Sequence, residues 1–439
     1  MIEPLLEVAR RRADGGADAL WRRVERTSVV FEWGRLKAAG AAEETGVNLR
    51  VRHGGRVGVA GSTAAAAPPE DLVGRALASA ALGEALELSF PPSAPLPSVP
   101  TVFAGASTAT LDGLIGIGRS LLERLARDGC RVNVVIERET GETRVANTAG
   151  AASSYQSSAV GVSAEVWRIA GDDVLTLGDA WEGADLPPEE TLAALVASIT
   201  TRLDHALRIV APPEGALPVI FTPAGLAALL LPVTQALSGK AVLQGISPLA
   251  GRVGEQVFDA AFSLTDDPLR PGRPASRPLD DECVPSRVVA LVARGRVQQF
   301  IYDLETAARA QTRSTGHGRR AIFAPPVPAY TNLVLGDAGA AACGDLGGGL
   351  VGQVRDGLLV DELIGVGQGN VIGGTFSHPV ALAYRIAHGE ITGRVKDAAL
   401  AGNAYELWRR VGGVGRDARW SGTRYAPSVL FGEVSVARR

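Results

Sequence analysis

A run of alternating apolar and polar residues between positions 46 and 59 constrains the fold more than any other part of the sequence. Val47, Leu49 and Val51 alternate with polar side chains, a His-Gly-Gly turn follows at residues 53–55, and the alternation then resumes. Because successive side chains of a strand point to opposite faces, this pattern predicts a β-hairpin with one face on a core. The chain must therefore build an antiparallel sheet and cover one side of it.

The spacing of apolar residues in the rest of the first half predicts both further strands and the helices that cover them. We expect helices over Glu3–Arg12, Glu70–Leu88, Leu111–Asp128 and Pro187–Leu207, and strands over Val24–Trp33, Arg131–Glu139, Thr143–Asn147 and Ser157–Ile169. The first half is therefore predicted to be α+β.

The segment Ala211–Gly215 (Ala-Pro-Pro-Glu-Gly) is typical of a linker, and 439 residues are more than one ordinary domain holds. We place an N-terminal α+β domain at residues 1–210 and a mostly β C-terminal domain at residues 216–439. Glycine, proline and short valine-rich segments dominate that second domain. Helical spacing is expected there mainly at Pro223–Leu237 and Ala398–Val411.

Composition excludes several classes of protein. The chain has 44 basic and 47 acidic residues, for a net charge of −3, which argues against a protein that binds nucleic acid through bulk charge. Its three cysteines are too few and too dispersed for a disulfide framework or a cysteine-cluster zinc site. No signal peptide or membrane-length apolar run is recognisable. We expect a soluble cytoplasmic protein with neither nucleic acid nor membrane as partner.

A group of carboxylates is the first candidate for chemistry: Asp266, Asp267, Asp280, Asp281 and Glu282. Carboxylates so close in sequence could bind a divalent cation or form an acid–base pair. The alternative is structural, because aspartate opens turns and the interspersed arginines would neutralise the acids. The spacing matches no calcium-binding loop.

Other reactive residue types form no catalytic set by themselves. No two histidines have the i, i+4 spacing of a zinc-binding helix, and the glycines of residues 365–369 precede no helix that would receive a phosphate. Ser377 and His378 are adjacent, so in a strand they face opposite sides. Cys283 and Cys343 lack the local signature of a nucleophile and are expected to be free thiols.

Several blocks of sequence, in a specific order and spacing, resemble the TldD/PmbA family. They are Leu264–Pro268, Ser276–Ser286, Arg313–His317, Gly374–Ser377 and Val395–Asn403, with weaker similarity at Gly46–Gly61 and Asn147–Gly150. The resemblance extends over nearly the whole chain.

The resemblance implies a cytoplasmic, heterodimeric metallopeptidase that acts on unfolded peptides. One subunit type, TldD, carries zinc on a His-Glu-x-x-x-His helix, with a distant cysteine as the third protein ligand. The other type, TldE or PmbA, lacks these ligands and completes the chamber that holds an extended peptide.

The sequence departs from the zinc-bearing type at the metal site itself. Block alignment puts the first histidine position at Leu230, the glutamate at Leu231 and the second histidine at Gln235, and the distant cysteine near Ser421. Leucine cannot bind zinc, and Pro232 is expected to break or kink the helix. The chain therefore resembles the TldE/PmbA type: we expect no cofactor in this chain and zinc in its partner.

The family blocks also suggest which side chains would contact a peptide: Asp281, Glu282, Arg313, Ser314, Thr315, His317 and Ser377. For each of them, turn formation or an internal ion pair is the alternative role.

The resemblance implies a non-catalytic subunit that positions peptide or peptide-like substrates for a TldD-like paralogue. The pathway is either housekeeping proteolysis or actinobacterial antibiotic biosynthesis of the lincosamide kind, and a homodimer also stays open. One alternative is a self-sufficient hydrolase that uses Cys283, Ser377 or the cluster Asp280, Asp281 and Glu282. The other is a regulatory binding protein without proteolysis, similar to a modulator of DNA gyrase.

Overall fold

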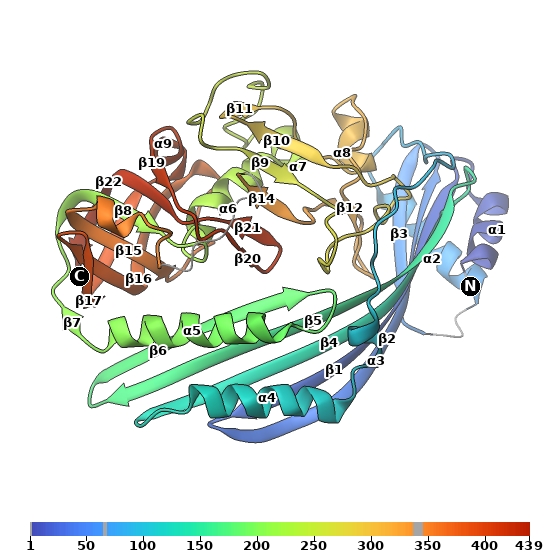
Figure 1. Cartoon of the computed structure of the whole chain (residues 1–439). Coiled ribbons are helices and arrows are strands. Elements are labelled where there is room, and N and C mark those ends of the chain that lie inside the picture. The colour runs from blue at the N-terminus through green and yellow to red at the C-terminus, as the bar shows by residue number, and fades with distance from the viewer. Residues whose placement is uncertain (1, 65–67, 337–345) are drawn as a thin grey trace.

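The computed structural model describes residues 2–64, 68–336 and 346–439. Cys343 lies outside the described residues. Long strands sweep along one side of the molecule, and the C-terminal half sits against them (Figure 1). The class is α+β, as the sequence predicts. None of the helices in the described part of the chain is long and apolar enough to cross a membrane.

The N-terminal sheet is antiparallel, in the order β3-β2-β1-β4-β5-β6. Its strands are β1 (Ala17–Glu32), β2 (Arg35–His53), β3 (Arg56–Ser62), β4 (Cys130–Asn147), β5 (Ala152–Ala170) and β6 (Asp173–Gly183). The hairpin expected around residue 54 is confirmed, because β2 and β3 pair up to the turn with His53 opposite Arg56. The two strands expected at residues 131–147 form the single strand β4.

Helices cover one face of this sheet, and their spacing follows the sequence. They are α1 (Glu3–Arg12), α2 (Pro69–Leu82), α3 (Ala104–Thr108), α4 (Leu111–Leu125) and α5 (Glu189–Ala206). At one end α1 and α2 pack on Ala17, Ala19 and Trp21 of β1. At the other end α4 and α5 pack on the buried valines and isoleucine of β4 and on apolar residues of β5 and β6. Helix α2 ends at Leu82, six residues earlier than expected.

Two further sheets and the helices between them make up the C-terminal half, which is mostly β as expected. The larger sheet contains β7 (Ile209–Val210), β8 (Gly215–Phe221), β15 (Asp356–Leu363), β16 (Thr375–Ala387), β17 (Glu390–Val395), β18 (Ala398–Asn403), β19 (Val411–Val414) and β22 (Val429–Arg438). The second contains β9 (Leu264–Asp266), β10 (Val289–Ala293), β11 (Arg296–Val297), β14 (Leu333–Leu335), β20 (Arg419–Ser421) and β21 (Arg424–Ala426). A short pair joins β12 (Gly318–Arg319) and β13 (Val327–Pro328).

The helical segments of this half are α6 (Ala227–Ala236), α7 (Gly239–Leu243), α8 (Leu304–Arg309), α9 (Ala404–Trp408), η1 (Val351–Gln353) and η2 (Val371–Gly373). The helix expected over residues 398–411 is wrong. Its first six residues form β18, between β16 and β22, and only the short helix α9 follows. Alanine fits either structure, so the period-two burial of Ala398 and Leu400 is hard to recognise in the sequence.

The C-terminal half contacts the N-terminal half in two places: on the sheet face opposite the helices, and at helix α5. Asp18 and Arg22 of β1 form ion pairs with residues beyond position 280. At the far end, Arg202 of α5 pairs with Asp361 of β15 at 2.6 Å, and Thr222 donates to the same carboxylate at 2.7 Å. These contacts tie the two halves together at both ends of the sheet.

The close approach of α2 to β3 generates a prediction about stability. A Cβ on Gly58 would lie 2.1 Å from the carbonyl oxygen of Ala76 and 2.2 Å from the nitrogen of Ala80. We therefore expect Gly58→Ala to lower the free energy of unfolding by about 2–3 kcal/mol, because the helix must move away from the strand. Urea unfolding followed by circular dichroism measures this.

Gly40→Ala is the matched control for that substitution. Gly40 also lies in a strand, but a Cβ there meets nothing within 4 Å. Its free energy of unfolding should stay within about 0.5 kcal/mol of the wild type. Equal losses in the two variants would contradict the explanation from helix packing.

Candidate functional site

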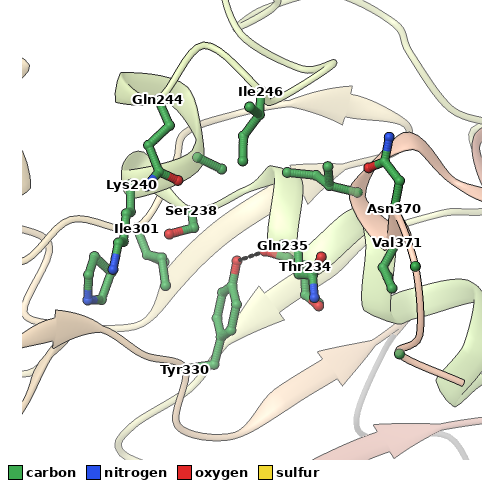
Figure 2. Close-up of a pocket in the computed structure, with 15 residues that line it drawn as sticks. Thr234, Gln235, Ser238, Lys240, Gln244, Ile246, Ile301, Tyr330, Asn370 and Val371 are labelled. Atoms are coloured by element: carbon green, nitrogen blue, oxygen red, sulfur yellow. Dashed lines mark hydrogen bonds between the residues drawn. The ribbon is translucent and has the colours of Figure 1, made fainter.

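A cavity of about 540 Å³ lies beside the helix to which the sequence assigned the missing zinc ligands. Its walls come from the end of α6, from α7, from the loop that leads into η2, and from Tyr330 (Figure 2). Gln235 and Thr234 of α6 line it, whereas Leu230 is buried in the core. We take this as the candidate site and call it the α6 cavity.

Helix α6 is held in place by side chains that bond to its carbonyl oxygens. Trp408 Nε1 donates to Leu229 O at 3.1 Å, and the Tyr405 hydroxyl donates to Pro232 O at 3.0 Å. The Tyr330 hydroxyl donates to Thr234 O at 2.7 Å, a bond visible in Figure 2. Thr234 lies in the last turn of the helix, where carbonyls lack partners within the helix, so the Tyr330 hydroxyl satisfies an oxygen that would otherwise be unpaired.

The expected break at Pro232 is wrong. The helix is continuous from Ala227 to Ala236, with Pro232 inside it. Proline removes one N–H from the helix ladder. The donors from Trp408 and Tyr405 bond the carbonyls of Leu229 and Pro232, next to that gap. Tertiary hydrogen bonds thus hold the helix on both sides of that gap.

The loop opposite α6 depends on glycines in the left-handed region. Gly365, Gly367 and Gly369 have φ values of 78°, 96° and 78°, a region that glycine enters without strain. This repeated conformation brings Asn370 and η2 to the wall of the cavity, beside Leu231. These glycines form turns, which explains their spacing without a nucleotide.

The lining of the α6 cavity suits binding better than bond cleavage. Amides and a hydroxyl come from Gln235, Gln244, Asn370 and Ser238, and apolar surface comes from the isoleucines around them. Amide groups donate and accept hydrogen bonds, as peptide groups do. No carboxylate, histidine or cysteine appears among the described residues of the lining, so Lys240 and Tyr330 are its only side chains of the kinds that usually act as general bases, and the Tyr330 hydroxyl is bonded to Thr234 O.

The predicted substrate residue Glu282 lies instead in a buried charged cluster between the two halves. Arg50 of β2 donates to Glu282 Oε1 at 2.6 Å and to both oxygens of Asp18, and Arg320 also pairs with Asp18. The second oxygen of Glu282 accepts from the nitrogen of Leu304. Burial raises the pKa of Glu282 to about 8, although Arg50 opposes the rise. The side chain is fully buried and occupied by internal partners.

Asp280 and Asp281 have internal partners as well. Asp280 accepts hydrogen bonds from the backbone of Glu282, Val284 and Gly318, and burial raises its pKa. Asp281 accepts a hydrogen bond from Arg22 Nη2 at 2.9 Å and another from the backbone nitrogen of Arg320 at 2.9 Å. Despite its burial, the neighbouring arginines, Arg22 first, lower the pKa of Asp281 to about 2.

The block at residues 313–317 supports the chain around Tyr302. The hydroxyls of Ser314 and Thr315 both donate to Tyr302 O. His317 is buried, with Nε2 3.0 Å from Asp266 and Nδ1 2.9 Å from the Thr315 hydroxyl. The side chain of Arg313 is exposed. This block therefore braces the core around α8.

Ser377 and Cys283 lie on different parts of the fold and in different surroundings. Ser377 is exposed on β16, opposite Ala401 of β18. Cys283 is buried against the N-terminal sheet, and burial raises the pKa of its thiol to about 12. Neither residue lines the α6 cavity.

Family models match both halves of the chain. The model for the PmbA/TldA metallopeptidase C-terminal domain matches residues 214–438, and the model for PmbA/TldA metallopeptidase domain 1 matches residues 17–80. The chain belongs to the PmbA/TldD family.

Individual relatives of the family match part of the sequence or the whole fold. A metalloprotease TldD homologue of Haemophilus influenzae is 33% identical over 208 residues, which are 47% of this chain and 42% of that protein. A metalloprotease of Methanothermobacter thermautotrophicus is 33% identical over 179 residues, which are 40% of this chain and 38% of that protein. The match thus spans less than half the length of these relatives.

Solved structures match the entire chain. TldE from Thermococcus kodakarensis superimposes with a TM-score of 0.88 at 24% identity and covers 99% of both chains. A structure from Thermotoga maritima described as a putative modulator of a DNA gyrase gives 0.85 at 24% identity, with 99% and 98% covered. At this identity the similarity establishes the fold.

The residues that the block alignment assigns to the zinc ligands expected for TldD do not fit zinc. Leu230 is packed in the core, Leu231 lies next to Gly367, and Gln235 offers a neutral amide. Ser421 lines a different cavity, on the N-terminal sheet. Among the described residues, no three side chains of His, Cys, Asp or Glu are placed to share a metal ion. Zinc binds imidazole, thiolate and carboxylate, so we derive no chemical step through a metal in this chain.

Sequence reasoning missed Tyr330, Tyr405 and Trp408, which fix the position of α6. No local pattern reveals them, because each bonds to a carbonyl between 96 and 179 residues away. The regular spacing of glycines at residues 365–369 was the sequence feature that could have indicated this wall of the cavity.

The charges around Asp281 lead to a prediction about pH. Its folded pKa of about 2 lies below the ordinary value of 3.8, so its ionised form stabilises the fold above pH 4 and is lost as pH falls towards 2. Asp281→Asn should therefore cost about 2 kcal/mol at pH 7. The difference from the wild type in urea midpoint should shrink between pH 4 and pH 2.

Asp172→Asn serves as its control, because this exposed carboxylate lies in the turn before β6. Its urea midpoint should equal that of the wild type within experimental error at every pH. A penalty for Asp281→Asn that stays constant from pH 4 to pH 2 would mean that shape, and not charge, explains the loss.

Proposed function

We propose that this chain is a metal-free, non-catalytic subunit of a TldD/TldE-like heterodimeric peptidase. It holds an extended peptide, or a small peptide-like substrate, while a zinc-bearing TldD-like partner cleaves it. The observation that carries the proposal is the substitution of Leu230, Leu231 and Gln235 at the positions of the family's zinc helix, on a helix whose backbone is intact.

The α6 cavity supports a role in holding peptide. A peptide in water has its N–H and C=O groups hydrogen-bonded, so a site that accepts it must replace those bonds. Gln235, Gln244 and Asn370 carry both donors and acceptors and line one cavity. Fixing the backbone of a substrate beside the partner's metal would contribute to catalysis through positioning alone.

A self-sufficient hydrolase is less consistent with the geometry. The raised pKa of Cys283 keeps its thiol protonated at neutral pH, and only the thiolate is a good nucleophile. Asp280, Asp281 and Glu282 are fully buried and bonded internally. Ser377 is exposed, and its neighbour His378 points to the other face of the strand.

A regulatory protein without proteolysis has support only from the fold it shares with the Thermotoga structure. The nearly balanced charge of this chain does not favour direct contact with DNA. We therefore keep the peptidase subunit as the proposal, with either housekeeping proteolysis or a lincosamide-like biosynthetic pathway as its setting. Genes next to the coding sequence distinguish these settings.

The test is reconstitution with a paralogue from the same genome that carries the His-Glu-x-x-x-His motif. The chain alone should contain no stoichiometric zinc and should not hydrolyse an unfolded peptide such as reduced casein. The two chains together should co-purify and hydrolyse it in a chelator-sensitive reaction. Chelator-sensitive hydrolysis by this chain alone, or failure to associate with the paralogue, would refute the proposal.

Filling the α6 cavity should impair this reaction. Gln235 is exposed, so Gln235→Trp should fold normally while its indole occupies part of the cavity. We expect kcat/KM of the reconstituted pair to fall on the order of tenfold or more, because the peptide is displaced from the reacting geometry.

Gln298→Trp introduces the same side chain at an exposed position that does not line the cavity. It should leave kcat/KM unchanged, and size-exclusion chromatography should show the same assembly for both variants. If both pairs are as active as the wild type, the α6 cavity does not hold the peptide.

A further inference from the structure

A second, smaller cavity of about 220 Å³ lies between the N-terminal sheet and the C-terminal half. Arg22, Tyr155 and Ser157 line it from the sheet, and Arg277, Arg319 and Tyr330 line it from the other side. Tyr330 also lines the α6 cavity, so the two cavities are neighbours that share this residue in their walls. We call this second cavity the arginine pocket.

Arg277 is the unusual residue of the arginine pocket. Its side chain is only 5% exposed, yet Nε and Nη2 have no hydrogen-bond partner among the described residues. Its third nitrogen, Nη1, is 4.0 Å from Asp281, beyond hydrogen-bonding distance. Unpaired buried donors are costly, and Arg277 also lines the cavity, so an anion that enters the cavity and reaches this edge of the guanidinium would relieve that cost.

The carboxylates around Arg277 do not satisfy it. Asp281 is already bonded to Arg22 Nη2 and to the backbone nitrogen of Arg320, and it also faces Arg319 at 3.8 Å. Glu139, at the sheet side of the pocket, is bonded at 2.9 Å to Arg26.

Three arginines in the wall of the pocket therefore share one carboxylate that is largely occupied. The remaining polar lining supplies hydroxyl groups, among them those of Tyr155 and Ser157. A cavity with excess positive charge and hydroxyl donors favours an anion.

The pattern of open donors indicates the kind of anion. Nε and Nη2 form one edge of the planar guanidinium, and two parallel N–H groups on one edge match the two oxygens of a carboxylate. The volume admits the end of a chain or one side chain, and not a longer segment.

We propose that the arginine pocket binds a carboxylate of the substrate, at the C-terminus of a peptide or on an acidic side chain. Arg277 forms the bidentate contact, and Arg22 and Arg319 supply further positive charge. The inference rests on the proposed function for its choice of peptide, and it adds that the substrate carries a negative charge close to the α6 cavity.

Binding to the isolated full-length chain tests the inference without the partner or any hydrolysis. Ligand-observed NMR titration compares N-acetylglycine, which carries a carboxylate, with N-acetylglycinamide, which is neutral and of similar shape. We expect the carboxylate to bind at least about tenfold more tightly, and Arg277→Gln to remove that advantage. Equal binding of both probes to the wild type would overturn the proposal.

Arg277→Gln alters a buried side chain and could fail to fold, so Arg319→Gln is the second variant. The Arg319 side chain is 48% exposed, and its replacement should not disturb folding. It should weaken N-acetylglycine binding several-fold while the melting temperature stays unchanged. Arg35→Gln removes an exposed arginine outside the pocket and should have no effect. Undiminished binding to well-folded Arg319→Gln and Arg277→Gln would also overturn the proposal.

Inorganic phosphate is the second probe, since free phosphate is another anion that arginines bind. Phosphate that binds more tightly than N-acetylglycine and depends on Arg277 would replace the assignment to a substrate carboxylate. If N-acetylglycine binds but the chain forms no active pair with the zinc-bearing paralogue, the carboxylate site stands and the proposed function fails. If the pair is active but N-acetylglycine does not bind, the proposed function stands and the carboxylate site fails.

Discussion

The buried guanidinium of Arg50 joins the two halves of this protein. It lies on β2, bonds both oxygens of Asp18 on the neighbouring strand, and reaches Glu282 in the C-terminal half. Replacing one member of such a cluster would leave an uncompensated charge in a dry environment, which is strongly destabilising. The relative position of the halves, and with it the walls of the arginine pocket, therefore depends on a contact that contributes little to either core.

This cluster explains why the acidic residues Asp280–Glu282 resemble a catalytic site when they are considered from the sequence alone. Asp280, Asp281 and Glu282 have shifted pKa values, as catalytic groups often do. Their partners are arginines and backbone amides of the same chain, from both halves. Burial raises the pKa values of Asp280 and Glu282, and ion pairing lowers that of Asp281, so shifted pKa values can arise from structural surroundings, and the lining of the cavities is the better guide to function here.

The sequence predicted what depends on local pattern. The alternation around the turn at residue 54 identified the β2–β3 hairpin, and apolar spacing identified α1, α4 and α5 nearly to their ends. It failed where distant contacts decide. The alanine-rich segment from Ala398 forms a strand because it pairs with β16 and β22. Helix α6 continues through Pro232, and side chains distant in the sequence donate hydrogen bonds to its carbonyl oxygens.

The candidate site could be predicted only in part, for the same reason. Alignment to the family identified Leu230, Leu231 and Gln235, and the structure places two of these beside a loop or cavity. The open donors of Arg277 depend on how Asp281 is shared among other residues, which no sequence pattern reveals.

The way α6 is anchored has a consequence for how such proteins diverge. Three of its backbone carbonyl oxygens accept hydrogen bonds from Trp408, Tyr405 and Tyr330. The position of the helix therefore does not depend on the side chains of Leu231 and Gln235. Side chains at these two positions can be exchanged during evolution while the scaffold keeps its shape. One framework can in this way carry different side chains, and with them different chemistry, at the same point of the helix.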